Sequence, residues 1–309
     1  MRLMFRFRCF FCLLVLAATA RAQVATKSDA PPSAPAAQPR PGRTPAPIVL
    51  NADDKAAFAP APVGFDQKRD GIARGKLELV EYKSTTVGTN RHMLIYTPPS
   101  YSAEAQYPVL YLLHGIGGDE HEWQRGASVD VILDNLHAEG KIVPMIVVLP
   151  NGRAQPNDRA EGDIFRHAPA FANFEGDLLK DVIPFVESTY SVKKNRESRA
   201  LAGLSMGGGQ SLNFGLGNLD TFAWVGGFSS APNTHTPETL VPKPEEAKKK
   251  LGLLWISCGD QDNLINISQR LHAYLKEKEV PHVWHVDSGR HDFKVWKNDL
   301  YLFSQRIFR

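Results

Sequence analysis

Beyond residue 75, hydrophobic positions gather in short runs that are separated by polar and glycine-containing segments. The runs cover residues 77–82, 92–98, 108–115, 145–152, 199–205, 223–229, 253–259 and 282–286. The middle runs are apolar at consecutive positions, which is typical of strands that are covered on both faces. The pattern therefore predicts strands that form one sheet whose middle strands are covered on both faces.

Between these runs, apolar residues recur at helical spacing. Phe174, Leu178, Val182 and Val186 follow one another at four-residue intervals, and Pro184 predicts a kink in that helix. A further helix is predicted around Val129 to Leu136, with Ser128 as its N-terminal cap. Two more are predicted at Ile267 to Leu275 and at Leu300 to Ile307. Strands that alternate with helices form a mostly parallel sheet with helices on both faces.

The first two strands have no helix between them, so they are expected to form an antiparallel hairpin at the edge of the sheet. An eight-stranded, mostly parallel sheet with helices on both faces and such a hairpin is the α/β-hydrolase plan. We therefore predict the α/β-hydrolase fold.

The N-terminal 22 residues have the layout of a secretory signal peptide. A basic start is followed by an apolar stretch at residues 9–18 and by a small-x-small pattern at residues 20–22. Crossing a bilayer takes about 20 apolar residues, and this stretch has about half that number. We expect a secreted or periplasmic protein with no stable membrane anchor after signal cleavage.

Residues 23–47 are rich in proline and alanine and lack large apolar side chains, which predicts a disordered linker. Residues 48–309 then form a single α/β-hydrolase domain. The formal net charge of +3 includes four arginines within the first 22 residues. The remaining chain is nearly neutral and gives no indication of a nucleic-acid partner. Cys258 lies in an apolar strand pattern and is interpreted as a buried core residue.

Glycines crowd around Ser205, where an apolar run gives way to a helical pattern. The stretch Gly203-Leu204-Ser205-Met206-Gly207 fits G-x-S-x-G, in which a strand turns sharply into a helix and exposes the serine hydroxyl. Residues two before and two after the serine have no room for side chains. The pattern and its context predict that Ser205 is a nucleophile.

A serine hydroxyl needs a base to accept its proton and a third group to orient that base. In this fold the chain order is serine, acid, histidine. His291 stands on a glycine-containing loop just past the last strand, whereas His282 and His285 lie within that strand and His114 precedes the serine. His291 is therefore the predicted base.

Two aspartates follow the penultimate strand, Asp260 and Asp262. Asp262 lies further into the loop and is better placed to reach His291, while Asp260 is better placed to cap the turn. Asp287 and Asp292 are too close to His291 in sequence to orient it easily. Spacing thus favours Asp262 and leaves Asp260 as the alternative.

An oxyanion hole requires two preorganised donors. The backbone amide of Met206, directly after the nucleophile, is one expected donor, and Ile116 in the glycine-rich loop at residues 114–118 is the other.

Several longer stretches resemble a known family. They are YPVLYLLHGIGGDEHEW, VVLPNGRA, NFEGDLLKDVIPFVESTYSV, GLSMGGGQSLNFGL, CGDQDNL and GRHDFKVWKNDLYLF. They resemble the esterase D-like group of α/β-hydrolases and, within it, the feruloyl and acetylxylan esterases of carbohydrate esterase family one. The resemblance runs from about residue 70 to the C-terminus. It implies a triad of Ser205, Asp262 and His291, which selects Asp262 over Asp260, and a serine esterase that needs no metal or organic cofactor.

The resemblance also implies an ester substrate, expected to be an acylated polysaccharide or oligosaccharide such as feruloylated or acetylated xylan. Aromatic residues near the predicted site suit a slot for a feruloyl ring, and the alternative is that they pack in the core; they are Trp123, Phe174, Phe228 and Trp296. Three other functions remain open: a siderophore or other small-ester hydrolase, an acyltransferase of the same fold, and a non-catalytic carbohydrate-binding relative.

Overall fold

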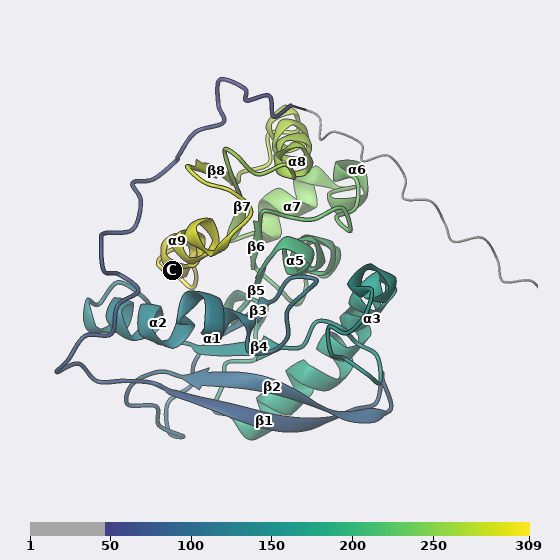
Figure 1. Ribbon diagram of the computed structural model, residues 1–309. Helices are drawn as coiled ribbons and strands as arrows, with labels where there is room; N and C mark the ends of the chain where they lie inside the picture. Colours follow the sequence, from purple (N-terminus) through teal and green to yellow (C-terminus); the bar gives the residue numbers. More distant parts are fainter. Residues whose placement is uncertain (1–46) are drawn as a thin grey trace, which may run out of the picture. The chain divides into compact units, whose positions relative to one another are not determined.

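A single eight-stranded sheet organises the residues that the computed structural model describes, 47–309 (Figure 1). The strands are β1 (Lys76–Ser84), β2 (Thr89–Thr97), β3 (Val109–Leu113), β4 (Ile146–Pro150), β5 (Arg199–Leu204), β6 (Trp224–Phe228), β7 (Leu253–Gly259) and β8 (Val283–Asp287). Their spatial order is β1-β2-β4-β3-β5-β6-β7-β8. The β1–β2 and β2–β4 pairs are antiparallel and the other pairs are parallel. The predicted mostly parallel sheet and its edge hairpin are confirmed.

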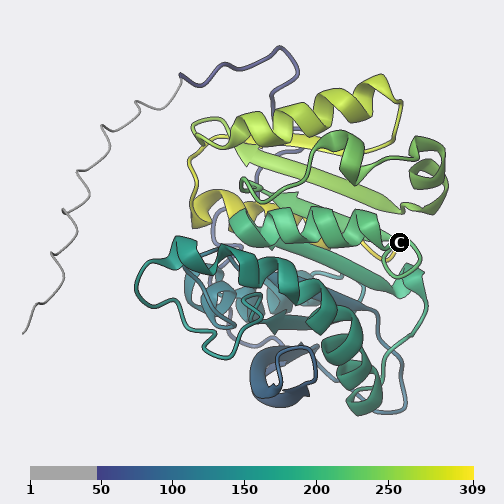
Figure 2. The same cartoon turned by 90° about the vertical axis from the view of Figure 1, so that its right-hand side faces the viewer.

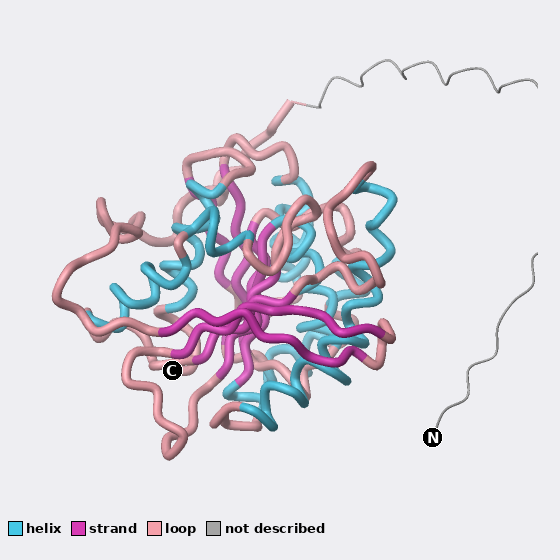
Figure 3. The backbone as a smooth tube through the Cα atoms, turned by 60° about the horizontal axis from the view of Figure 1, so that its bottom comes forward, coloured by secondary structure: helices cyan, strands magenta, loops and turns pink. Residues whose placement is uncertain are grey.

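Helices cover both faces of this sheet, as Figure 3 shows. The α-helices are α1 (Glu122–Ala127), α2 (Val129–Ala138), α3 (Ala168–Asp177), α4 (Ile183–Thr189), α5 (Ser205–Gly217), α6 (Pro237–Leu240), α7 (Pro244–Lys250), α8 (Ile265–Glu277) and α9 (Phe293–Ser304). Helical turns of other types are the 3₁₀ turns η1 (Ile164–His167) and η3 (Arg196–Ser198) and the π-helical turn η2 (Leu178–Val182). Side chains of α1, α2 and α9 build the core on one face, and those of α3 to α8 build the core on the other face, toward which Figure 2 looks.

The central strands have apolar side chains at successive positions because both of their faces are covered. In β3, Leu110 and Leu112 belong to the core beneath α1, α2 and α9, whereas Val109, Tyr111 and Leu113 belong to the opposite core. Alternate side chains of a strand point to opposite faces, so one continuous apolar run serves two cores.

The helix predicted around Phe174 to Val186 is interrupted by a π-helical turn. The turn η2 lies between α3 and α4 and ends just before Ile183-Pro184. Proline has no N–H to donate to a carbonyl one turn earlier, and a π-helical turn accommodates that loss. The predicted irregularity at Pro184 is therefore present. Ser128 precedes α2 as predicted, but it has a φ of +51° and forms no side-chain cap, so its expected capping role is wrong.

Residues 47–75 contain no helix or strand and run along the outside of β8, α9 and α2, in the purple segment of Figure 1. The Ala57 amide donates to Nδ1 of His285 over 3.0 Å, and the Ala61 amide donates to Oδ1 of Asn298 over 2.7 Å. Arg306 places its guanidinium 3.6 Å from the centre of the Phe58 ring. These contacts fasten the segment to the sheet.

The predicted signal peptide, residues 1–22, lies outside the described residues, as does the predicted linker, residues 23–47, except for its last residue. Within residues 47–309, no helix combines the length and the apolar character needed to cross a bilayer.

Candidate active site

Ser205 occupies a sharp turn between β5 and α5, and its φ of +52° lies in the left-handed region. A non-glycine residue adopts this conformation only where its surroundings impose it. A Cβ on Gly203 would lie 2.6 Å from the carbonyl oxygen of Gly207, and one on Gly207 would lie 2.5 Å from the carbonyl oxygen of His114. Both glycines are therefore required by backbone contact, which is the reason that the sequence pattern suggests.

The turn places the Ser205 hydroxyl within hydrogen-bond distance of His291. The Ser205 Oγ atom lies 2.9 Å from Nε2 of His291, and Nδ1 of the same ring lies 2.7 Å from Oδ2 of Asp262. A carboxylate can only accept a hydrogen bond, so Nδ1 carries a proton and donates a hydrogen bond to Asp262. Nε2 of the neutral ring is then free to accept the serine proton. The structure thus brings the three predicted triad residues into one hydrogen-bonded chain.

Asp262 is buried at the end of this chain, with 1% of its surface exposed. Its second oxygen accepts the backbone N–H of Leu264 over 2.8 Å. Burial on its own raises the pKa of Asp262, but the hydrogen bond and charge of His291 and the Leu264 amide outweigh it and lower that pKa below its ordinary value. Asp262 is therefore an ionised carboxylate that can stabilise a positive imidazole.

The other aspartates near His291 are engaged elsewhere. Asp260 accepts the Gly289 amide over 2.9 Å, which fits the turn-capping role that its position suggests. Asp292 caps α9 by accepting the Lys294 amide over 2.9 Å, and Asp287 accepts the side-chain amide of Asn298 over 2.5 Å. None of the three is hydrogen-bonded to His291 among the described residues.

The loop at residues 114–118 lies directly against the nucleophile. A Cβ on Gly115 would be 3.5 Å from the Cβ of Ser205. In the described part of the chain, the backbone amide of Ile116 has no hydrogen-bond acceptor. Met206 lies in the first turn of α5, where backbone amides have no partner within their own helix. Both predicted oxyanion donors therefore lie next to Ser205 with amides available to bind an oxygen.

The four aromatic residues considered for a substrate slot are core residues. Trp123, Phe174 and Phe228 have exposed fractions of 1%, 0% and 0%, and Trp296 has 7%. The Trp123 indole donates to the carbonyl oxygen of Leu113 over 2.9 Å. The expectation of an aromatic slot made by these residues is wrong, because strands and helices on both faces of the sheet cover them.

Trp296 supports the site in a different way. Its ring meets the His291 imidazole edge to face, with centroids 4.9 Å apart and an interplanar angle of 88°. An aromatic face packed in this way restricts the orientation of the base.

A different aromatic side chain is open to solvent near the loop at residues 114–118. Phe165 in η1 is 72% exposed. Its neighbour Ile164 lies 3.9 Å from the position that a Cβ on Gly117 would occupy.

A hollow of about 600 Å³ opens beside His291. It is lined by Gln261, Asp262, Asn263, Leu264, Arg290 and His291. The side chains of Gln261, Asn263 and Arg290 are exposed to solvent. The hollow therefore offers uncharged and cationic hydrogen-bond donors next to the base.

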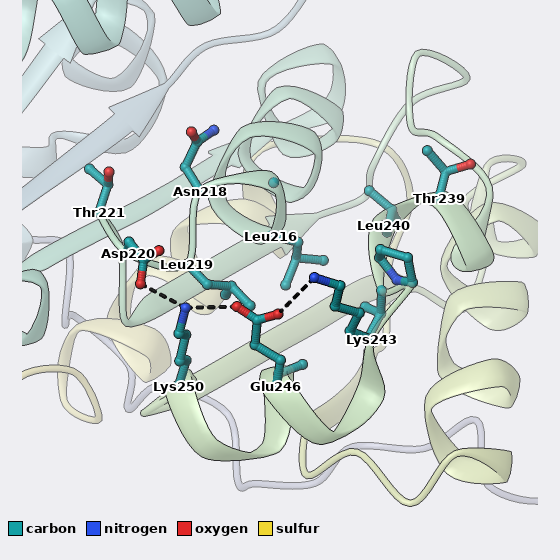
Figure 4. A pocket seen from close by; sticks show the side chains of 14 residues that line it. Leu216, Asn218, Leu219, Asp220, Thr221, Thr239, Leu240, Lys243, Glu246 and Lys250 are labelled. Atoms are coloured by element: carbon teal, nitrogen blue, oxygen red, sulfur yellow. Dashed lines mark hydrogen bonds and ion pairs between the residues drawn. The ribbon is translucent and has the colours of Figure 1, made fainter.

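A second hollow lies at the far end of α5 (Figure 4). Lys250 contacts the carboxylates of Asp220 and Glu246, both at 2.7 Å, across its lower rim. It is separated from Ser205 by the length of the 13-residue helix α5, which is about 20 Å. It lacks a paired nucleophile and base, so the reactive site is the one at Ser205. Over residues 47–309, no group of three or more His, Cys, Asp or Glu side chains could hold a metal ion.

Sequence reasoning missed the residues that hold the loop at 114–118. Arg153 is fully buried and donates to the carbonyl oxygen of Ile116 over 2.5 Å, and Glu122 accepts the Gly115 amide over 2.6 Å. No local pattern signals such long-range contacts, which depend on how the loops after β3 and β4 meet.

The chain is similar to known esterases over most of its described length. The model of the Esterase family matches residues 84–306. An endo-1,4-beta-xylanase/feruloyl esterase from Xylanibacter ruminicola is 30% identical over 251 residues, which are 79% of this chain and 33% of that protein. An acetyl esterase from Caldicellulosiruptor saccharolyticus is 25% identical over 222 residues, which are 60% of this chain and 78% of that protein. The chain thus spans a third of the length of the first relative.

Among solved structures, the CE1 ferulic acid esterase of Anaeromyces mucronatus without substrate superimposes with a TM-score of 0.72 at 25% identity. The match covers 82% of this chain and 98% of the esterase. A structure of the same esterase in complex with ferulic acid gives a TM-score of 0.71 at 25% identity, with coverage of 81% and 96%. The fold shared with these neighbours is the α/β-hydrolase fold that the strand pattern predicts. On the family match and this architecture, the chain belongs to the Esterase family.

Proposed function

We propose that this protein is a serine carboxylic-ester hydrolase that removes feruloyl, or acetyl, groups from a plant cell-wall polysaccharide such as xylan. The observation that carries the proposal is the hydrogen-bonded chain from Ser205 through His291 to Asp262, built on a strained turn. Relatives named feruloyl esterase and acetyl esterase support the acyl groups proposed.

In the first half of the reaction, the Ser205 Oγ attacks the ester carbonyl carbon and its proton passes to Nε2 of His291. The imidazole then carries a positive charge, which the ionised Asp262 stabilises. The developing oxyanion is held by the amides of Met206 and Ile116. As the tetrahedral intermediate collapses, the C–O bond to the alcohol breaks, and His291 gives its proton to the leaving oxygen.

In the second half, water attacks the acyl-serine. His291 accepts a proton from the water, the acid is released, and the proton returns to Ser205. The same two amides stabilise the second oxyanion. Apart from the ester and water, no step needs a group beyond the side chains and amides of this chain.

The leaving alcohol must come within hydrogen-bond distance of His291 Nε2, because His291 protonates it. The hollow beside His291 is lined by Gln261, Asn263 and Arg290, whose amide and guanidinium groups suit the hydroxyls of a sugar. This lining supports a saccharide as the alcohol part of the ester. It also fits an acyltransferase, in which a sugar hydroxyl would replace water as the acceptor.

The first test is hydrolysis of p-nitrophenyl acetate by the wild type and by Ser205→Ala. We expect turnover by the wild type and a loss of about 10⁴-fold or more in the variant. Equal rates in the two proteins, or no turnover by the wild type, would contradict a serine hydrolase and favour a carbohydrate-binding protein without catalysis.

The second test ranks the substrates. We expect a higher kcat/KM with feruloylated or acetylated xylo-oligosaccharides than with methyl ferulate, and a lower one with a cyclic catechol ester of the siderophore type. Asn263→Ala should reduce the advantage of the oligosaccharide and leave methyl ferulate hydrolysis nearly unchanged. A preference for the catechol ester would overturn the polysaccharide assignment, and transfer of the acyl group to an added sugar would identify an acyltransferase.

Export is part of the proposal and rests on the N-terminal sequence pattern alone. If residues 1–22 act as a signal peptide, the protein recovered outside the cytoplasm begins near residue 23. N-terminal sequencing of the exported protein tests this, and an uncleaved N-terminus would contradict it.

A further inference from the structure

The loop beside Ser205 is held by side chains that the reaction scheme above does not use. His114 places its Nδ1 2.7 Å from the carbonyl oxygen of Gly115. A carbonyl can only accept, so Nδ1 carries a proton. The other ring nitrogen, Nε2, accepts from the Gly152 amide over 2.8 Å and also lies 3.1 Å from Oδ1 of Asn151. Burial lowers the pKa of His114 and so favours the neutral ring, in which Nδ1 carries the proton and Nε2 accepts from Gly152.

The orientation of the Gly115 carbonyl sets that of the next amide. This carbonyl oxygen accepts from His114 and also from the Gly118 amide over 3.1 Å. In a trans peptide the C=O and the following N–H point in opposite directions. Because His114 and Gly118 hold the Gly115 oxygen on one side, the Ile116 N–H is directed to the other side.

The peptide groups before and after this one are held as well. The Gly115 N–H donates to Oε2 of Glu122 over 2.6 Å. The Ile116 carbonyl oxygen accepts from Nη2 of Arg153 over 2.5 Å. Three successive peptide groups are therefore fixed by three side chains, from the end of β3, from α1 and from the loop after β4.

Arg153 is an unusual group in this arrangement. It has no exposed surface, and its guanidinium hydrogen bonds go to the carbonyl oxygens of Ile116, Gly118 and Asp158. Its charged plane also lies over the ring of Phe171, 5.2 Å from the centroid. Buried arginines are normally neutralised by a carboxylate. Arg153 instead donates to backbone carbonyl groups, two of which belong to the loop beside the nucleophile.

We propose that Arg153, His114 and Glu122 are positioning residues that aim the Ile116 amide at the oxyanion formed on the ester, with Arg153 also placing a positive charge behind it. The inference rests on the proposed hydrolase function. It predicts that these residues act on the transition state more than on the bound substrate, because a misdirected amide weakens only the interaction that the oxyanion makes.

The test compares Arg153→Met with a matched control, Arg159→Met. Arg159 lies in the same loop and contacts the carboxylates of Glu120 and Asp158, but its guanidinium does not contact residues 114–118. Rates with p-nitrophenyl acetate are divided by the active-site concentration from fluorophosphonate titration. Arg153→Met should lower kcat by about 100-fold with a change in KM of less than about threefold, as expected for loss of one oxyanion donor. Arg159→Met should stay within about threefold of the wild type in both constants.

A second readout separates positioning from a structural role. A phenylboronic acid forms a tetrahedral adduct with Ser205, whereas ferulate binds without one. Arg153→Met should weaken boronate binding in proportion to its loss of kcat/KM and leave ferulate binding unchanged. Parallel losses of both ligands, or equal effects of Arg153→Met and Arg159→Met, would overturn the inference.

If Arg153→Met does not fold, His114 supplies a second comparison. Asparagine can place its Nδ2 donor where the ring carries Nδ1–H, so His114→Asn should retain most of the wild-type kcat, and His114→Leu should lose about 100-fold. Equal kcat in these two variants would overturn the inference. An inactive wild type, or an active Ser205→Ala, would instead refute the hydrolase function on which it rests.

Discussion

Two loops meet at the reactive serine, and they are held in opposite ways. The turn at residues 203–207 is fixed by the absence of side chains, because a Cβ on Gly203 or Gly207 would lie within 2.6 Å of backbone oxygen atoms. The loop at residues 114–118 is fixed by the presence of side chains, because Glu122, His114 and Arg153 each bind one of its peptide groups. The first is a steric constraint and the second is a set of directed hydrogen bonds.

The difference decides how each loop fails when it is changed. A steric constraint within a turn is violated outright by one added methyl group, since backbone cannot move aside cheaply. When one of several hydrogen bonds that hold a loop is removed, the peptide group that it held changes orientation, while the remaining hydrogen bonds keep the loop folded. The nucleophile turn should therefore fail in folding and catalysis together, and the oxyanion loop should fail in catalysis first.

The largest effect is expected from Gly207→Ala. Its Cβ would lie 2.5 Å from the His114 carbonyl oxygen and 2.7 Å from the backbone of Leu113, so β3 and the turn must separate. We expect at least a 100-fold loss of kcat/KM, the scale of a displacement of about 1 Å, together with a lower Tm. Gly217→Ala is the matched control, because a Cβ at Gly217 in the same helix has no neighbour within 4 Å. A Gly207→Ala protein as active and stable as the control would show that the turn is not sterically fixed.

The second-largest effect is expected from breaking the buried ion pair between Arg91 and Asp177, which lies against the loop after β4. Arg91 pairs with Asp177, and its guanidinium donates to the carbonyl oxygens of Asn151 and Arg153, both over 2.8 Å. Asp177→Asn removes the closer of the two carboxylates paired with the buried arginine and leaves only Asp158, at 3.4 Å. It should lower the free energy of unfolding by about 3 kcal/mol, measured by urea denaturation. Replacing Arg166, whose side chain is 86% exposed in its pair with Asp163, should change that free energy little. Equal effects of the two changes would contradict this prediction.

A smaller, pH-dependent effect is expected from His114. Burial lowers its pKa, so between that value and the unfolded pKa of about 6.5 the unfolded chain binds the extra proton. The contribution of His114 to stability is therefore complete above about pH 6.5 and is lost as the pH falls toward the folded pKa. The free energy of unfolding should fall less steeply between pH 7 and pH 5 in His114→Asn than in the wild type.

The difference between these two curves isolates His114, because burial also lowers the pKa of His282 and His285 in both proteins. Parallel curves for wild type and variant would mean that His114 does not titrate differently in the folded and unfolded chains.

The smallest effect is expected at the hollow of Figure 4. Lys250→Met removes exposed contacts with Asp220 and Glu246 at the end of α5 remote from Ser205. Neither kcat nor KM for p-nitrophenyl acetate should change measurably. A clear loss would show that this end of α5 communicates with the site.

The sequence predicts the sheet and the nucleophile turn well because both leave local signatures. Apolar runs record burial on two faces, and glycines at positions 203 and 207 record backbone contact. The partner of His291 is less well marked: spacing favours Asp262 and leaves Asp260 open, and the resemblance to a known family selects Asp262, which the structure pairs with His291. The sheet and the turn depend on residues close in sequence or on the order of strands.

The parts that the sequence does not reveal depend on contacts between distant loops. Trp123 lies in α1 and Phe228 is the last residue of β6, and both pack inward. The direction of an aromatic side chain depends on helices placed elsewhere in the chain. Arg153 is 37 residues from Ile116, and its burial depends on the loop after β4 folding over it. A charged residue in a polar loop gives no sign that it will be buried.

The hydrogen bond from the Gly289 amide to Asp260 has a consequence for engineering. It joins the segment that carries Asp262 to the segment that carries His291, and a Cβ on Gly259 would lie 2.4 Å from the Gly289 oxygen, so the two backbones touch. Asp262 and His291 are therefore expected to move together when either segment shifts. Chimeras that exchange specificity loops between homologous enzymes should transplant the two segments together, because exchanging one alone would separate a matched pair.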